Sequence, residues 1–200
     1  MHRWVGRRSE TFVGPGPAGE RRPFLAPRHL AVALLIVAAA ASRLLPHPPN
    51  VTPVAAMALF GGAAFVDLRL ALLVPLGAMV LSDLVLGLHG TLPFVYGALA
   101  ATALIGRLVR RRRRPAALVA ASLTASTLFF LVTNFGVWLV GGLYPKTAAG
   151  LAAAYVAGLP FFRNTLLGDL AFTVLLFGGF ALLERMVPAL RASVRSPGMA

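Results

Sequence analysis

The chain contains no cysteine and few acidic residues, and both shortages narrow what it can be. Without cysteine there is no disulfide scaffold, no thiolate catalysis, and no iron–sulfur or cysteine-ligated zinc site. Only 6 of the 200 residues are Asp or Glu and only 12% are charged, whereas 58% are hydrophobic. Soluble domains are roughly 45–50% apolar, so this composition excludes a soluble domain, and it equally excludes a disordered chain. A mean hydropathy of +0.80 predicts a membrane protein.

Apolar stretches along the chain are long enough, or nearly so, to cross a bilayer, which takes roughly 20 helical residues. They lack the alternation of apolar and polar residues that strands require, so helices are expected. The stretches are 29–45, 53–66, 70–88, 92–109, 116–140 and 161–187. The second is short and contains Gly61 and Gly62, so we expect it to be broken, strongly tilted or shielded by neighbours. Residues 147–160 could form a further short helix at the surface. The sequence thus predicts an all-α, polytopic membrane protein with about six transmembrane helices.

Positive charge is concentrated on alternate connections. Of the 19 Lys and Arg residues, 16 lie before the first stretch, near or after the end of the last stretch, or in or beside the second and fourth connections. Only Arg43, Lys146 and Arg163 fall on the other side. By the positive-inside rule, this pattern predicts cytoplasmic N- and C-termini. The net charge of +13 then reflects orientation and contact with the lipid bilayer. No nucleic-acid partner is expected, because the arginine run at 110–114 lacks interleaved aromatic residues.

These patterns divide the chain into three parts. Residues 1–28 are Gly- and Pro-rich and basic, and we expect a disordered cytoplasmic tail. Residues 29–187 form the six-helix membrane domain, and residues 188–200 form a second cytoplasmic tail. An alternative for the first stretch is a cleaved signal peptide ending near Ser42, because small residues follow an apolar region of suitable length.

Polar side chains inside the apolar stretches gather toward the predicted external end. A polar group in hydrocarbon is costly unless it faces a partner or a cavity, so these residues predict a substrate-binding site. Carboxylates and amides would supply directional hydrogen bonds, arginines would bind acidic groups, and aromatic rings would form a flat wall. The candidates are Arg43, His47, Asn50, Asp83, Asn134, Trp138, Tyr144, Arg163, Asn164 and Asp169. The alternative is that the pairs Asp83–Arg43 and Asp169–Arg163 merely hold helix ends together.

Other functions have weaker sequence support. His47 and His89 could ligate a metal together with Asp83 and Asp169, but no metal-binding spacing is present, and no metal or cofactor is expected. The chain has no GxSxG motif, so a membrane enzyme is a minor alternative beside a non-transporting scaffold or regulatory subunit. The absence of a GxxxxGK[ST] loop means that any use of ATP requires a separate partner. Small residues at helical spacing in 92–109 predict close internal packing or a docking face.

Several segments resemble a known family of proteins. The segments SRLLPHPPNVTPVAAMALFGG, LSDLVLG, TNFGVW with YPKT downstream, and NTLLGD resemble small bacterial transport proteins related to the substrate-binding S components of energy-coupling factor (ECF) vitamin transporters. The resemblance covers residues 29–187. It implies a multi-pass protein of the bacterial cytoplasmic (inner) membrane that takes up a vitamin or related micronutrient from the external side, with a possible ATP-driven coupling module. Solitary members that transport cobalamin make cobalamin a candidate; without cysteine, only His47 or His89 would remain to ligate its cobalt.

Overall fold

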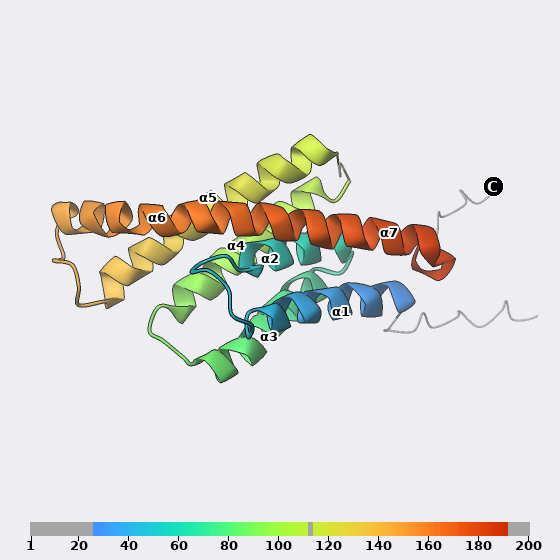
Figure 1. Cartoon of the computed structure of the whole chain (residues 1–200), viewed down its shortest axis with the longest axis horizontal. Helices are drawn as coiled ribbons and strands as arrows, with labels where there is room; N and C mark the ends of the chain where they lie inside the picture. Colours follow the sequence, from blue (N-terminus) through green and yellow to red (C-terminus); the bar gives the residue numbers. More distant parts are fainter. Residues whose placement is uncertain (1–25, 112–113, 192–200) are drawn as a thin grey trace, which may run out of the picture.

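The structure, a computed structural model, describes residues 26–111 and 114–191 (Figure 1). Helices account for 80% of these residues, which contain no strand, so the predicted all-α fold is confirmed. The predicted disorder of the first tail concerns residues that lie almost wholly outside this description, as do residues 192–200. The helices are α1 (Pro27–Ser42), α2 (Val54–Ala64), α3 (Leu68–Leu86), α4 (Leu92–Val109), α5 (Pro115–Val140), α6 (Ala148–Thr173) and α7 (Gly179–Met186).

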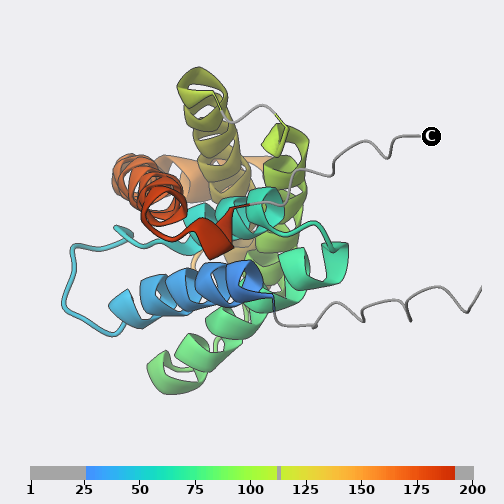
Figure 2. The same cartoon turned by 90° about the vertical axis from the view of Figure 1, so that its right-hand side faces the viewer.

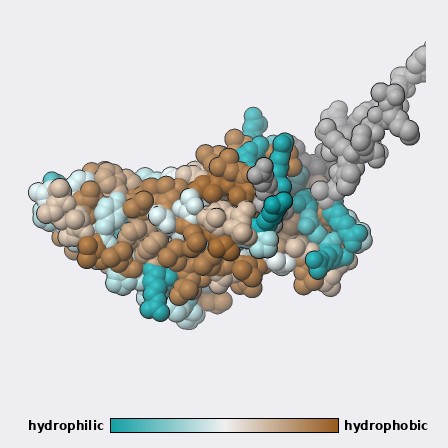
Figure 3. Space-filling model, turned by 90° about the horizontal axis from the view of Figure 1, so that it is seen from above, coloured by the Kyte–Doolittle hydropathy of each residue, from teal (hydrophilic) through white to brown (hydrophobic). Residues whose placement is uncertain are grey.

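The helical bundle has two ends that hold different connections (Figure 1). The end that we call the terminal end holds the start of α1, the α2–α3 and α4–α5 connections, and the end of α7. The opposite end, the hairpin end, holds the α1–α2, α3–α4 and α5–α6 connections. Hydrophilic surface gathers toward the terminal end, and apolar surface covers much of the remainder (Figure 3). The described arginines at the terminal end are Arg28, Arg69, Arg107, Arg110, Arg111, Arg114, Arg185 and Arg191.

Four helical segments are long and apolar enough to cross a membrane: Leu68–Leu86, Leu92–Val109, Pro115–Val140 and Ala148–Met186. The helices α1 and α2 are shorter, at 16 and 11 residues. Every residue of α2 is buried, and α2 contacts α1, α3, α4, α5 and α6, so it lies in the middle of the bundle (Figure 2). A helix that never faces lipid does not need to match the bilayer thickness, and shielding by neighbours therefore accounts for its short length.

The last helical segment differs from the sequence prediction. We expected a span beginning at Phe161, with 147–160 as a stretch that could form a separate short helix, and the start of that span is wrong. Instead, helix runs continuously over the 39 residues Ala148–Met186, with a π-helical turn at Val174–Gly178. At 1.5 Å per residue this helix is about 58 Å long, nearly twice the thickness of the hydrocarbon core. Pro160 removes one backbone hydrogen bond without ending the helix. The α5–α6 hairpin consequently projects beyond the other connections (Figure 1).

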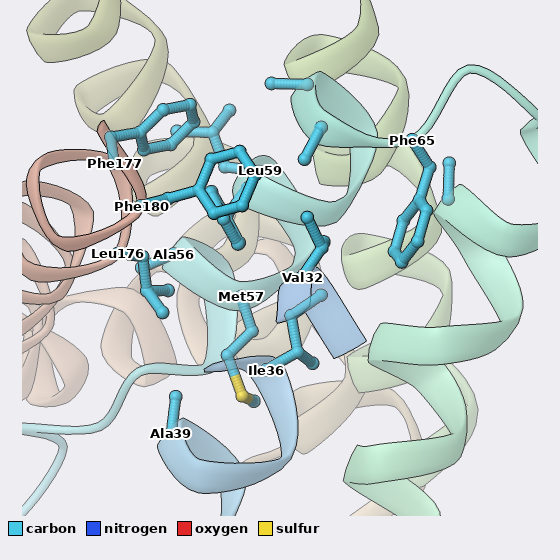
Figure 4. Packing of buried hydrophobic residues seen from close by; sticks show 14 of the residues in the cluster. Val32, Ile36, Ala39, Ala56, Met57, Leu59, Phe65, Leu176, Phe177 and Phe180 are labelled. Carbon is cyan, nitrogen blue, oxygen red and sulfur yellow. The ribbon is translucent and has the colours of Figure 1, made fainter. Parts of the chain in front are cut away.

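The main core surrounds α2. Phe60 of α2 makes edge-to-face contacts with Phe177 and Phe180, at centroid distances of 5.1 and 5.7 Å. Val32 and Ile36 of α1 are fully buried in the same cluster (Figure 4). At the terminal end, Arg28 forms an ion pair with Glu184 and donates to the Leu190 carbonyl at 2.8 Å. These contacts join the two ends of the described chain.

The helices α2 and α4 approach each other at two glycines. A Cβ atom at Gly62 would lie 1.9 Å from the Ala103 carbonyl oxygen, and one at Gly106 would lie 2.1 Å from that of Leu59. Ala98 and Thr102, at the preceding positions of the same small-residue stripe, are also buried. The stripe therefore serves internal packing, as the first of the two sequence interpretations proposed.

Candidate functional site

A cavity at the hairpin end lies between α5, α6, the start of α2 and the loops. It consists of two hollows of about 360 and 250 Å³. The hollows adjoin, because both are lined by Asn50, Phe129, Thr133 and Thr165. Asn50 and His89 are exposed lining residues that lie in the α1–α2 and α3–α4 connections, so the mouth of the cavity faces the hairpin end.

Asp169 lines the deep part of the larger hollow. It belongs to α6 and is 2% exposed. Its Oδ2 accepts a hydrogen bond from the Ser126 hydroxyl of α5 (2.7 Å), and its Oδ1 accepts one from the Ala56 N–H of α2 (3.3 Å). The first N–H groups of a helix lack intrahelical acceptors and carry partial positive charge, so this carboxylate caps α2 from a neighbouring helix. Three helices thus meet at Asp169.

Arg43 lines the same hollow and is held by a second carboxylate behind it. It donates to Asp83 Oδ1 at 2.8 Å, to the Met79 sulfur at 3.0 Å, and to the Ser82 hydroxyl. The other Asp83 oxygen accepts from the Tyr96 hydroxyl at 2.9 Å. Because Asp83 is 2% exposed and does not line the cavity, its negative charge compensates Arg43 from within the bundle. The predicted Asp83–Arg43 ion pair is confirmed.

The α1–α2 connection closes one side of the mouth. Asn50 adopts a left-handed conformation with φ of 61°, which Asn tolerates better than most residues. Asn164 of α6 donates to the Pro49 carbonyl at 2.9 Å. A Cβ atom at Gly168 would lie 3.1 Å from the Val51 Cα, so α6 packs directly against the backbone of this connection. These contacts hold Asn50 over the cavity.

Aromatic rings form the wall of the smaller hollow. Phe130 of α5 lies 4.5 Å from Phe162 of α6 between ring centroids, and 5.8 Å from Tyr155. Asn134 lies one turn beyond Phe130 and donates to its carbonyl at 2.9 Å. The lining therefore combines apolar rings with hydroxyl and amide groups. The smaller hollow is lined by Asn50, Phe129, Phe130, Thr133, Asn134, Val137, Gly158, Phe161, Phe162 and Thr165.

The cavity brings together four of the ten predicted site residues, namely Arg43, Asn50, Asn134 and Asp169. The other six lie outside its lining. Asp83 and Asn164 support lining residues from behind, and Arg163 is exposed and forms no ion pair with Asp169 within the described ranges. His47 is exposed and contacts the Leu45 carbonyl. Trp138 donates to the Pro145 carbonyl at 2.9 Å, so it closes the α5–α6 hairpin, where Tyr144 also lies.

The sequence analysis did not identify three residues that support or line the cavity. Ser126 bonds Asp169, Tyr96 bonds Asp83, and Phe129 lines both hollows. The spacing of Ser122 and Ser126, four residues apart in an apolar helix, was a usable signal for a polar face. A single tyrosine or phenylalanine among many apolar residues gave no comparable signal, because apolar helices bury such residues against any neighbour.

The histidines and carboxylates do not form a metal centre. In the part of the chain that the structure describes, no group of three or more His, Asp or Glu side chains could hold a metal ion. His89 Nδ1 instead contacts the Thr91 hydroxyl at 2.7 Å. The lining offers hydrogen-bonding groups, the Asp169 carboxylate, the Arg43 guanidinium and aromatic surface, which are the means of binding a small molecule.

Comparison with known proteins identifies a family whose description gives no function. A family model described as a family of unknown function (DUF6580) matches residues 24–190. No curated protein and no solved structure matches the chain significantly. The matched range spans the bundle from α1 to α7 and includes every residue that lines the cavity.

Proposed function

The chain belongs to the DUF6580 family, and we propose that it is a membrane transport protein that binds a small solute at its hairpin end. The observation that carries this proposal is the buried carboxylate of Asp169 lining a cavity inside an apolar bundle. A charged group at such a depth is costly, and such residues are typical of substrate and ion pathways. The mixture of aromatic walls and a few polar groups is typical of small-molecule sites.

The proposal includes an orientation and a direction of uptake. The terminal end, with its arginines, lies in the cytoplasm of a bacterial cell according to the positive-inside rule. The cavity then opens to the external side, as the resemblance to S components implies. The helices α1 and α2 complete a bundle of six spans around the site. Any use of ATP would require a separate coupling module, because the chain has no phosphate-binding loop.

The size of the cavity bears on the solute. Small-molecule pockets range from roughly 300 to 1,000 Å³. The larger hollow, of about 360 Å³, is at the lower end of that range, and the smaller, of about 250 Å³, is below it. They favour a compact vitamin-like molecule over one as large as cobalamin. No described residue is a cysteine that could supply a thiolate, and no three or more described His, Asp or Glu side chains are grouped so that they could bind cobalt.

Single-cysteine labelling tests whether this cavity is open to water from outside. The natural chain has no cysteine, so each substitution introduces a unique thiol. Thr133→Cys places it in the cavity lining, whereas Thr124→Cys places it on the exposed, lipid-facing surface of the same helix. Both hydroxyls bond the carbonyl four residues earlier (2.7 and 2.8 Å), so the two sites match locally.

We expect a charged, membrane-impermeant thiol reagent added to intact cells to label Thr133→Cys about tenfold faster or more than Thr124→Cys, because thiolates form in water and not in lipid. Mass spectrometry of the purified protein should also find a stoichiometric small molecule. Equal labelling of the two variants, or labelling of Thr133→Cys only after cells are opened, would contradict the external cavity. Protein that is always empty, with normal labelling, would favour a scaffold or regulatory subunit.

A further inference from the structure

The charges around the cavity do not balance, and the imbalance indicates the class of solute. Among the described residues that line the cavity, Arg43 and Asp169 are the arginine and the carboxylate, and His89 adds an imidazole. Arg43 is neutralised by its ion pair with Asp83. Asp169 has no such partner among the residues described, since the ion pairs there are Arg28–Glu184 and Arg43–Asp83. An ionised Asp169 is therefore a negative charge that pairs with no described cation.

The neighbours of Asp169 reduce this deficit without removing it. The N-terminus of α2 contributes at most about half a positive charge, and Ser126 contributes a neutral hydroxyl. A carboxylate has about four acceptor positions, of which Ser126 and the backbone N–H groups of Ala56 and Ala55 occupy at most three. Acceptor capacity thus remains on a group that lines the cavity. His89 is exposed in the α3–α4 connection at the mouth, where it contacts Thr91.

Aromatic rings lie beside this carboxylate along the same two helices. Phe129 is one turn from Ser126 on α5, and it lines both hollows. Phe161, Thr165 and Asp169 succeed one another at four-residue spacing and line one continuous face of α6. The faces of aromatic rings attract cations within about 6 Å. A carboxylate at the deep end and phenylalanines toward the mouth together suit a molecule with a cationic head and an apolar body.

We infer that the solute is an organic cation, whose positively charged nitrogen contacts Asp169 and whose apolar part lies along Phe129, Phe130 and Phe162. This inference rests on the proposed function and names the class of solute for the same cavity. A cationic head would supply the missing charge, and its apolar substituents would occupy space that inorganic cations leave empty.

Three probes of the same shape but different charge test this inference. Choline carries a trimethylammonium group; the second probe is the alcohol in which a tert-butyl group replaces it, and the third is the carboxylate with the same tert-butyl group. Binding to the purified full-length protein in lipid nanodiscs is measured by calorimetry, with sodium chloride as a fourth titrant. We expect choline to bind about tenfold more tightly than the neutral alcohol, which is one decade in Kd.

Two substitutions assign that preference to the site. Asp169→Asn keeps an oxygen for the Ala56 N–H and presents an amide N–H to the Ser126 hydroxyl oxygen, and it should abolish the preference for choline. Asp67→Asn is the matched control: Asp67 caps α3 on the α2–α3 connection at the terminal end, Asn is also a good cap, and binding should not change. If Asp169→Asn does not fold, Phe129→Leu should weaken choline several-fold while leaving the neutral alcohol unaffected.

Each contrary result overturns the inference. Equal affinity for choline and the alcohol would remove the role of charge, and preference for the carboxylate would instead assign the site to anions through Arg43. Binding of sodium without choline would assign Asp169 to an inorganic cation. Binding of no probe at millimolar concentration would exclude small organic cations. Normal labelling of Thr133→Cys in any of these cases would leave the proposed solute-binding function intact.

Discussion

Replacing Arg43 by methionine is expected to destabilise the folded protein by roughly 3–5 kcal/mol, the usual cost of leaving one partner of a buried ion pair alone. The Arg43 side chain is 12% exposed and that of Asp83 only 3%. After the substitution, the Asp83 carboxylate keeps the Tyr96 hydroxyl at 2.9 Å but loses the guanidinium at 2.8 Å. No other cation among the described residues is bonded to it.

Thermal unfolding of the purified protein in detergent micelles measures this loss. The double variant Arg43→Met with Asp83→Leu should recover most of the stability, because it leaves no unpaired charge in the bundle. Arg163→Met is the control, since Arg163 is an exposed arginine at the same end of the bundle, and it should change stability by less than about 0.5 kcal/mol. A single Arg43 variant as stable as the natural protein would mean that the pair contributes nothing.

Alanine at Gly62 or Gly106 is expected to cost roughly 3 kcal/mol or more, at the upper end for overpacked cores. The added methyl groups would lie 1.9 and 2.1 Å from carbonyl oxygens of the facing helix. Backbone oxygens cannot rotate away as a side chain does, so α2 and α4 would have to separate. Because α2 contacts the other helices of the bundle, that separation would disturb packing on every side.

Gly97 provides a matched control for this prediction. It lies on the same helix α4, and a Cβ atom there would meet no atom within 4 Å. Gly97→Ala should therefore be neutral or slightly stabilising, because alanine has the higher helix propensity. Unfolding midpoints of the three alanine variants, compared in one detergent, check both expectations. Similar midpoints for Gly62→Ala and Gly97→Ala would show that the α2–α4 contact is looser than described.

The pattern of hydrophobic residues predicted the bounds of most helices closely. The predicted stretch 92–109 coincides with α4, and 116–140 differs from α5 by one residue. Long apolar segments leave few alternatives, because backbone groups in hydrocarbon must be satisfied within the segment. The structure differs from the prediction at 147–160, which the sequence analysis treated as a stretch that could form a separate short helix. There, neighbouring α5 packs along α6 and the helix continues through Pro160.

Candidate site residues were harder to predict than helices. Burying a polar side chain in hydrocarbon costs free energy, so polar residues in apolar segments are functional candidates. This criterion selected both Asp83 and Asp169. It cannot distinguish a carboxylate paired inside the bundle from one that lines a cavity. That difference depends on Arg43, Tyr96 and Ser126, which reach the carboxylates from other helices.

The sequence by itself determined that the chain is all-helical and apolar enough for membrane spans, where most of its helices lie, and on which connections its basic residues gather. These properties follow from local composition and from the requirement that each segment satisfy its own backbone in lipid. Only the tertiary structure decided that α2 is a short, wholly buried helix and that Asp169 caps it at the edge of a cavity. Those features depend on contacts between segments up to 113 residues apart, which composition and periodicity do not encode.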